Sequence, residues 1–209
     1  MLQLLTITLS LLTLLTTTTL ALPTPSKSNS KVTTNTFVLN GLPAPTGTLK
    51  YIALGYGTQN YSCAALNDAP VSIGALATLY DATSILSHGA IGAASIPKMP
   101  ALALSMGSGL GLPTLGHHFF SAAGVPTFSL EAAKPAALLS AKKVADVVAP
   151  TNSAPNSVDW LFLTDDGRGV SKHLNAVYRV ETAGGKPPGV CSSVGTVTEQ
   201  YAAEYWFYD

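Results

Sequence analysis

Short strand-like runs recur along this chain, and each is bounded by glycine, proline, asparagine or aspartate. Runs of apolar, aromatic and β-branched residues between such turn-forming residues are typical of β-strands. Helical segments do not alternate with them, so the pattern favours an all-β, mainly antiparallel sandwich or barrel over a parallel sheet. We predict about eight strands, at residues 49–55, 61–66, 71–82, 117–120, 126–130, 159–164, 176–182 and 201–208.

Three stretches of the pattern need separate interpretation. The runs 49–55 and 61–66 are separated by "YGTQN", which predicts a hairpin turn. Residues Pro135–Val148 fit helical spacing, although their end also alternates like a strand. Residues 84–116 are rich in Gly, Ala, Ser and Pro, so we predict a flexible surface insertion there, with a mobile lid over a site as the alternative.

The N-terminal segment predicts export. Residues Leu2–Leu22 carry no charged side chain, and threonines dilute their apolar character, which favours a cleaved signal peptide over a permanent membrane helix. We therefore expect residues 1–21 to be a signal peptide, 22–40 a disordered lead-in, and 41–209 a single β domain. The mature protein is expected to be secreted, extracellular and free of the membrane.

The charge balance argues against nucleic acid as a partner. Lys and Arg number 11 and Asp and Glu also number 11, so no net positive charge exists to attract a phosphate backbone. No cofactor or metal is expected from any motif of the chain.

The two cysteines, Cys63 and Cys191, predict one disulfide in a secreted protein. A bridge across so long a loop would stabilise the fold by about 5 kcal/mol in the chain-entropy model. A metal-ligand or nucleophilic cysteine is the alternative. The sequon "NYS" makes Asn60 a candidate glycosylation site, and an unoccupied sequon within a strand is the alternative there.

The motif "GHHFF" contains the adjacent histidines His117 and His118. Successive side chains of a strand point to opposite faces, so the two imidazoles are not expected to bind one metal ion together. We expect one to be a structural histidine facing the core. The alternative is that one of them meets Asp81 or Glu204 across strands and acts as a base or ligand.

The last strand is crowded with aromatic residues. Alternation sends Tyr205 and Phe207 to one face and Trp206 and Tyr208 to the other. One set is expected in the core. The other is either buried as well or exposed as a platform on which sugar rings stack, so Tyr205, Trp206 and Tyr208 are candidate ligand-binding residues.

Several longer motifs together resemble one family. They are "LPAPTGTLKYIALGYGTQNYSC", "LYDA", "GHHFF" with "PTF", "VDWLFLT", "GVSKHLNAVYRVETAGGKPPGVC" and "YAAEYWFYD". Over about Leu42 to Asp209 the chain is similar to the domain-of-unknown-function family 3455, found among secreted fungal and exported bacterial proteins. The resemblance implies secretion and a single domain, and it implies no established activity and no catalytic residues.

Some relatives in that family carry a malate dehydrogenase label, which the chain does not support. A dinucleotide site needs G-x-G-x-x-G between a strand and a helix. Here "GYGTQN" has only the first two glycines and leads into another strand-like run.

These observations predict a non-enzymatic extracellular or cell-wall-associated β domain, with cell-wall or host glycans as candidate partners. The alternative is a secreted hydrolase or metal-dependent enzyme that uses His117 or His118. A structural or interaction protein of the wall surface is a third possibility.

Overall fold

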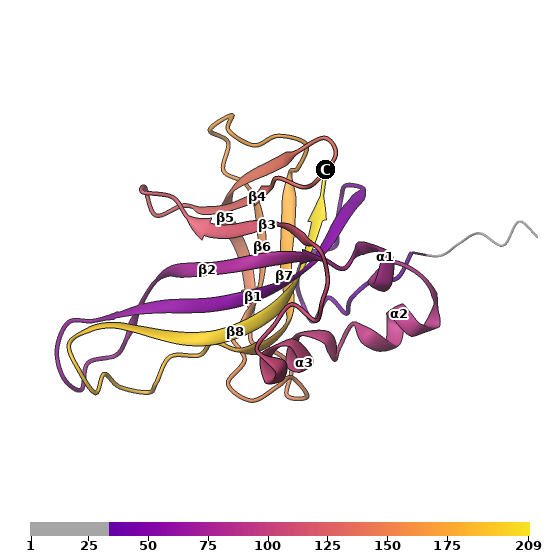
Figure 1. Cartoon of the computed structure of the whole chain (residues 1–209). Helices are drawn as coiled ribbons and strands as arrows, with labels where there is room; N and C mark the ends of the chain where they lie inside the picture. Colours follow the sequence, from indigo (N-terminus) through magenta and orange to yellow (C-terminus); the bar gives the residue numbers. More distant parts are fainter. Residues whose placement is uncertain (1–33) are drawn as a thin grey trace, which may run out of the picture. The chain divides into compact units, whose positions relative to one another are not determined.

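The structure is a computed structural model that describes residues 34–209, and its eight strands form one closed barrel (Figure 1). Each strand pairs antiparallel with the next along the chain, and β1 pairs with β8 to close the ring. The predicted antiparallel β fold is therefore confirmed. The strands are β1 (Leu49–Cys63), β2 (Val71–Asp81), β3 (Thr114–Phe120), β4 (Pro126–Leu130), β5 (Ala137–Val147), β6 (Trp160–Asp165), β7 (Ala176–Gly184) and β8 (Gly195–Tyr208).

The predicted hairpin near the start of the domain is wrong. Residues 49–63 form one continuous strand, β1, and "YGTQN" lies within it. Gly57 is needed there for close approach and not for a turn, because a Cβ on Gly57 would lie 1.9 Å from the carbonyl oxygen of Leu76 in β2. The ambiguous stretch Pro135–Val148 contains a strand, β5. The strand count is thus as expected, although two of its members change.

The surface insertion between β2 and β3 contains three short helices, α1 (Thr83–Leu86), α2 (Gly89–Ser95) and α3 (Met99–Met106). Pro100 stands in the first turn of α3, and Gly107 ends that helix in the left-handed conformation. The helix α3 packs on β1, β7 and β8. Within residues 34–209, no helix has the length and apolar character that crossing a bilayer requires.

The inside of the barrel is one apolar cluster built from alternate residues of the strands. Its tightest part lies at the end of the barrel where β1 begins and β8 ends. We call this the packed end, and its fully buried side chains are Leu79, Leu130, Leu139, Val177 and Phe207.

A second apolar cluster lies outside the barrel wall. Trp206 of β8 and Tyr178 of β7 pack there against Phe37, with ring centroids 5.2 and 5.1 Å apart. Leu86 of α1 and Ala103 of α3 belong to the same cluster. Both faces of β8 are therefore buried over residues 201–208, one by the barrel interior and the other by the insertion and the chain before β1.

The residues just before the barrel differ from the disordered lead-in predicted for 22–40. Phe37 is buried against the outer wall, and the backbone N–H of Asn35 donates to the carbonyl of Ser87 at 2.6 Å. The proposed signal peptide, its cleavage site and the lead-in up to residue 33 lie outside the described residues.

Candidate functional site

The barrel is hollow at the end opposite the packed end. A cavity of about 840 Å³ opens there, where the β1–β2, β3–β4, β5–β6 and β7–β8 loops gather because the strands run alternately up and down. We call this cavity the chamber. Its apolar lining includes Ala75, Phe120, Phe128, Leu161 and Leu163, and its polar lining includes Gln59, Tyr61, His118, Arg179 and Tyr205.

His118 enters the barrel from β3 and is almost completely buried. Its Nδ1 lies 2.9 Å from the carbonyl oxygen of Thr127 and must donate the hydrogen, because a carbonyl only accepts. The ring stacks on Phe128, with centroids 4.2 Å apart and planes 9° from parallel. Burial lowers the pKa of His118 to about 4, and the charge of Arg179 acts in the same direction. At neutral pH the imidazole is therefore uncharged, with a lone pair on Nε2.

Arg179 comes from β7, where its backbone lies between Leu161 of β6 and Tyr205 of β8. One terminal guanidinium nitrogen donates to the carbonyl of Asp159 at 2.8 Å. The Nε atom is buried and has no hydrogen-bond partner within residues 34–209. Because the side chain is permanently charged, Arg179 gives the chamber a cation with a buried donor that lacks an acceptor.

Three further polar side chains reach the same region from β1 and β8. The hydroxyls of Tyr201 and Tyr205 lie 2.8 Å apart in a hydrogen bond. Gln59 is only 6% exposed, and in the described part of the chain its Nε2 has no acceptor at hydrogen-bond distance. Gly55 makes room for this arrangement, because a Cβ there would lie 2.5 Å from the ring of Tyr205.

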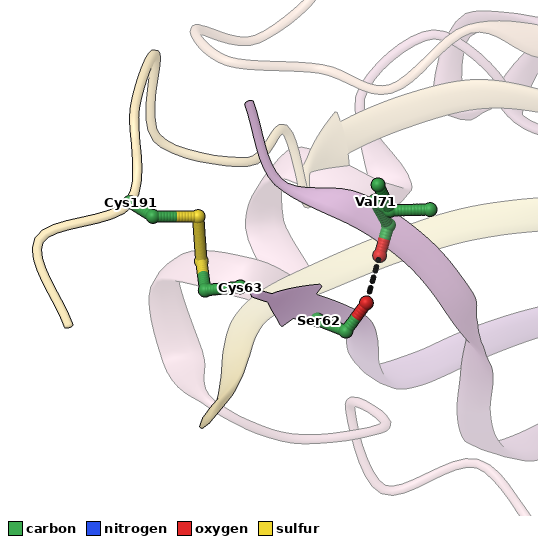
Figure 2. The surroundings of a disulfide bond; sticks show 4 residues. All are labelled: Ser62, Cys63, Val71 and Cys191. Carbon is green, nitrogen blue, oxygen red and sulfur yellow. Dashed lines mark hydrogen bonds between the residues drawn. A yellow bond between two sulfur atoms is a disulfide. The ribbon is translucent and has the colours of Figure 1, made fainter. Parts of the chain in front are cut away.

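The rim of the chamber is fastened by the disulfide between Cys63 and Cys191, which confirms the predicted pair. Figure 2 shows Cys63 at the end of β1 and the neighbouring Ser62 hydroxyl donating to Val71 of β2 at 3.5 Å. Cys191 belongs to the β7–β8 loop, whose Pro187 and Pro188 line the chamber. The covalent link therefore holds this part of the wall against the end of β1.

Charges around the chamber are mixed, with a small excess of cations. Lys143 is paired with Asp146 at 2.9 Å. Among residues 34–209, neither Arg179 nor Lys186 forms an ion pair, and the carboxylate of Asp159 forms none either. Two unpaired cations thus face one unpaired carboxylate.

The two adjacent histidines diverge, as the strand geometry predicts. His117 points outside, where its Nδ1 lies 3.6 Å from a carboxylate oxygen of Glu131. The structure brings neither histidine to Asp81 or Glu204. Asp81 ends β2 and accepts the backbone N–H of Thr83 at 2.9 Å, and Glu204 lies on the outer face of β8. The acidic partners that we weighed for an imidazole are thus elsewhere.

Glu204 is buried in the outer cluster, where its Oε2 accepts the indole N–H of Trp206 at 2.9 Å. Burial raises the pKa of Glu204 well above 4.5, and burial also raises the pKa of Glu181 to about 7. Burial therefore favours the protonated, uncharged form of Glu204 in the outer cluster.

The candidate sugar-stacking rings are not on the surface. Trp206 is 0% exposed, Tyr205 1% and Tyr208 7%. Tyr205 alone reaches the chamber, while Trp206 and Tyr208 belong to the outer cluster. Asn60 of the sequon lies within β1 between Gly74 of β2 and Thr198 of β8, and it is partly exposed.

Arg179 and Gln59 are the chamber residues that sequence reasoning missed. Arg179 is in phase with Val177 and Gln59 with Tyr61, both of which face inward, so alternation places each inside the barrel. A charged or amide side chain that alternates in phase with core residues of the same strand would have indicated a polar site inside the barrel.

A family model described as "Protein of unknown function (DUF3455)" matches residues 43–209. No curated protein and no solved structure matches this chain. Within the described part of the chain, no three His, Cys, Asp or Glu side chains are grouped so that they could hold a metal ion.

Proposed function

This chain belongs to the DUF3455 family of proteins of unknown function, and from that premise we propose that it is a secreted, non-enzymatic protein that binds a small organic molecule inside its barrel. The observation that carries the proposal is the chamber, a cavity of about 840 Å³ open at one end. Its volume falls in the range of about 300–1,000 Å³ that small-molecule sites occupy.

The barrel architecture supports this function. Eight-stranded barrels have an interior that side chains can fill or that can hold one small ligand. In this barrel the packed end is filled and the other end is hollow. Phe120, Phe128, Leu161 and Leu163 offer apolar and aromatic surface, and a few polar groups offer direction, which is the usual composition of a ligand site.

Binding is favoured over catalysis by the state of the one buried imidazole. With a pKa of about 4, His118 is a weak base at neutral pH. Its Nδ1 hydrogen bonds to a backbone carbonyl and not to a carboxylate that would raise its basicity. An enzymatic role for His118, or for the exposed His117, is the competing hypothesis, and it requires a turnover that depends on one of these rings.

Secretion is supported by two features. The uncharged segment Leu2–Leu22 is typical of a signal peptide, and the disulfide Cys63–Cys191 is typical of an oxidising compartment. Cell-wall and host glycans were candidate partners through an exposed aromatic platform. Because Trp206 and Tyr208 are buried under the insertion, a ligand in the chamber is the better supported partner.

The experiment is a fluorescence titration with the neutral dye N-phenyl-1-naphthylamine, which brightens on entering an apolar site. We expect saturable binding of one dye per chain. Ala75→Trp, inside the chamber, should abolish binding, whereas Leu76→Trp, on the neighbouring exposed position, should leave it unchanged. Saturable binding that is equal in both variants, or no binding to the folded wild type, would contradict the proposal.

A further inference from the structure

The chamber has a polar floor, where the buried side-chain atoms that lack a hydrogen-bond partner among residues 34–209, Arg179 Nε and Gln59 Nε2, are donors. Resting on the proposed function, we infer that the ligand is an organic monocarboxylic acid, whose carboxylate is bound by Arg179 and Gln59 while its apolar part fills the chamber.

Arg179 carries a positive charge that has no anionic partner among residues 34–209. Its guanidinium is charged at any physiological pH, and its protein partners are neutral: the carbonyl of Asp159 at 2.8 Å and the hydroxyl of Tyr205, whose pKa is raised by burial and lowered in part by its contact with Arg179. The Nε donor is buried without an acceptor, and among residues 34–209 no carboxylate pairs with this side chain. A buried donor on a cation is costly to leave unpaired, and a carboxylate is its strongest complement.

Gln59 offers a second hydrogen-bond donor, on a different strand from Arg179. This side chain comes from β1 and is 6% exposed, yet its Nε2 has no acceptor. The same region contains the Tyr201 hydroxyl, on which both side chains act. Burial raises the pKa of Tyr201 well above 10, while Arg179 and Gln59 each lower it. Two donors from different strands therefore border one hydroxyl pair, and neither has an acceptor at ordinary hydrogen-bond distance among residues 34–209.

The remaining groups are compatible with one negative charge. Tyr201 and Tyr205 share one hydrogen in their mutual bond, which leaves a second hydroxyl hydrogen for another acceptor. His118 is neutral at pH 7. Asp146 is neutralised by Lys143, and the opposing charge is that of Asp159 at the chamber wall, with Glu199 beside Tyr61.

The charge of the floor and the apolar lining of the wall indicate which class of acid fits the chamber. A phosphate or a dicarboxylate would bring two charges to a floor with one half-buried cation, Arg179. The wall is aromatic and aliphatic. His118 stacks on Phe128, and Leu161 and Leu163 of β6 belong to the same lining. An acid with an aromatic ring or a short hydrocarbon chain satisfies both the floor and the wall.

The test compares two probes that differ in the charged group, 2-naphthoate and its neutral amide, 2-naphthamide. Each is titrated against the protein saturated with N-phenyl-1-naphthylamine, and displacement gives its affinity. We expect the acid to bind about 10- to 100-fold more tightly than the amide, which is the usual effect of a charge-assisted hydrogen bond.

Three variants locate the effect. In Arg179→Gln the preference for the acid should disappear, and in Arg179→Lys a part of it should return. Lys142→Gln removes the same charge from an exposed position of β5 outside the chamber lining and should keep the preference. Thermal unfolding of each variant identifies any that fails to fold. If an Arg179 variant fails to fold, the test is whether the wild-type protein prefers the acid and whether the single variant Gln59→Leu reduces that preference.

The outcomes separate the two proposals. Dye binding without a preference for the acid, or a preference that survives Arg179→Gln, would overturn the inference and leave the binding function intact. Failure of the neutral dye to bind the folded protein would contradict the proposed function. In that case calorimetric titration of 2-naphthoate alone is decisive, and an absence of heat would overturn the inference as well.

Discussion

The two ends of the barrel interior are built from the same strands and hold different kinds of side chain. At the packed end, Leu79, Leu130 and Phe207 are completely buried and fill the interior. At the chamber end, Gln59, His118 and Arg179 surround empty space of about 840 Å³. Both ends obey the same alternation, so strand geometry alone does not distinguish them.

The contrast between the two ends indicates that the packed end mainly stabilises the fold and that the chamber end carries the proposed binding function. Apolar side chains that touch on all sides contribute packing energy and nothing else. Polar groups that are buried without partners cost stability, and a ligand that supplies the missing partner offsets that cost. Glu204 of the outer cluster is a useful contrast, because burial favours its uncharged form, whereas Arg179 keeps its charge.

The largest expected effect comes from the disulfide that fastens the chamber rim. Replacing Cys63 and Cys191 by serine removes a link between residues 128 apart, and the chain-entropy model gives a loss of about 5 kcal/mol in the free energy of unfolding. Urea denaturation measures it. We also expect weaker dye binding by the folded fraction, since the loop with Pro187 and Pro188 loses its attachment. A loss below about 1 kcal/mol would show that the link is incidental to the fold.

A truncation at the packed end should be the next largest. Phe207→Ala leaves a hole in a filled core and should cost about 3–5 kcal/mol, measured by urea denaturation, without changing the affinity for N-phenyl-1-naphthylamine. The matched change at the chamber end is Leu161→Ala. Because Leu161 is half-buried and borders empty space, it should cost less stability and should weaken dye binding. The reverse pattern would contradict the division of the interior.

The buried imidazole should make the chamber end sensitive to acid. The pKa of His118 is about 4 in the folded protein, below its ordinary 6.5, so the unfolded chain takes up the proton first as the pH falls. This contribution to stability is complete above pH 6.5 and declines between pH 6.5 and 4, by up to about 3 kcal/mol. Unfolding free energies at several pH values, compared between the wild type and His118→Phe, measure it.

The control for that acid response is His117→Phe, which removes an exposed imidazole from the opposite face of β3. We expect its pH profile to follow the wild type. A wild-type profile that His118→Phe leaves unchanged would show that His118 is not the titrating group.

The smallest expected effect on stability is that of Gln59→Leu. This change removes a buried donor without a partner and should leave the free energy of unfolding unchanged or raise it by about 1 kcal/mol. The same variant should bind 2-naphthoate less tightly. A clear loss of stability in thermal unfolding would instead assign Gln59 a structural role.

Much of the fold follows from local pattern, and the site does not. Alternation and turn residues predict an antiparallel β domain, and they place His117 and His118 on opposite faces. They mislead at Gly57, because a glycine required for close approach of β2 looks like a turn. The short helices between 83 and 106 are small-residue segments whose weak spacing carries little signal.

The chamber could not be predicted because it depends on which inward positions meet across the ring. Arg179 and Gln59 are far apart in sequence, and their missing partners are a property of three-dimensional packing. The aromatic last strand was noticed, but whether its outer rings are exposed depends on the insertion and on Phe37, which cover them.

The most direct test of the account is methyl NMR of the wild-type protein titrated with 2-naphthoate. The account predicts saturable shifts of the methyl signals of Leu161 and Leu163 at the chamber, while those of Leu130 and Leu139 at the packed end stay unchanged. Shifts confined to methyls of the outer surface, or an absence of any saturable shift, would contradict a ligand chamber in this barrel.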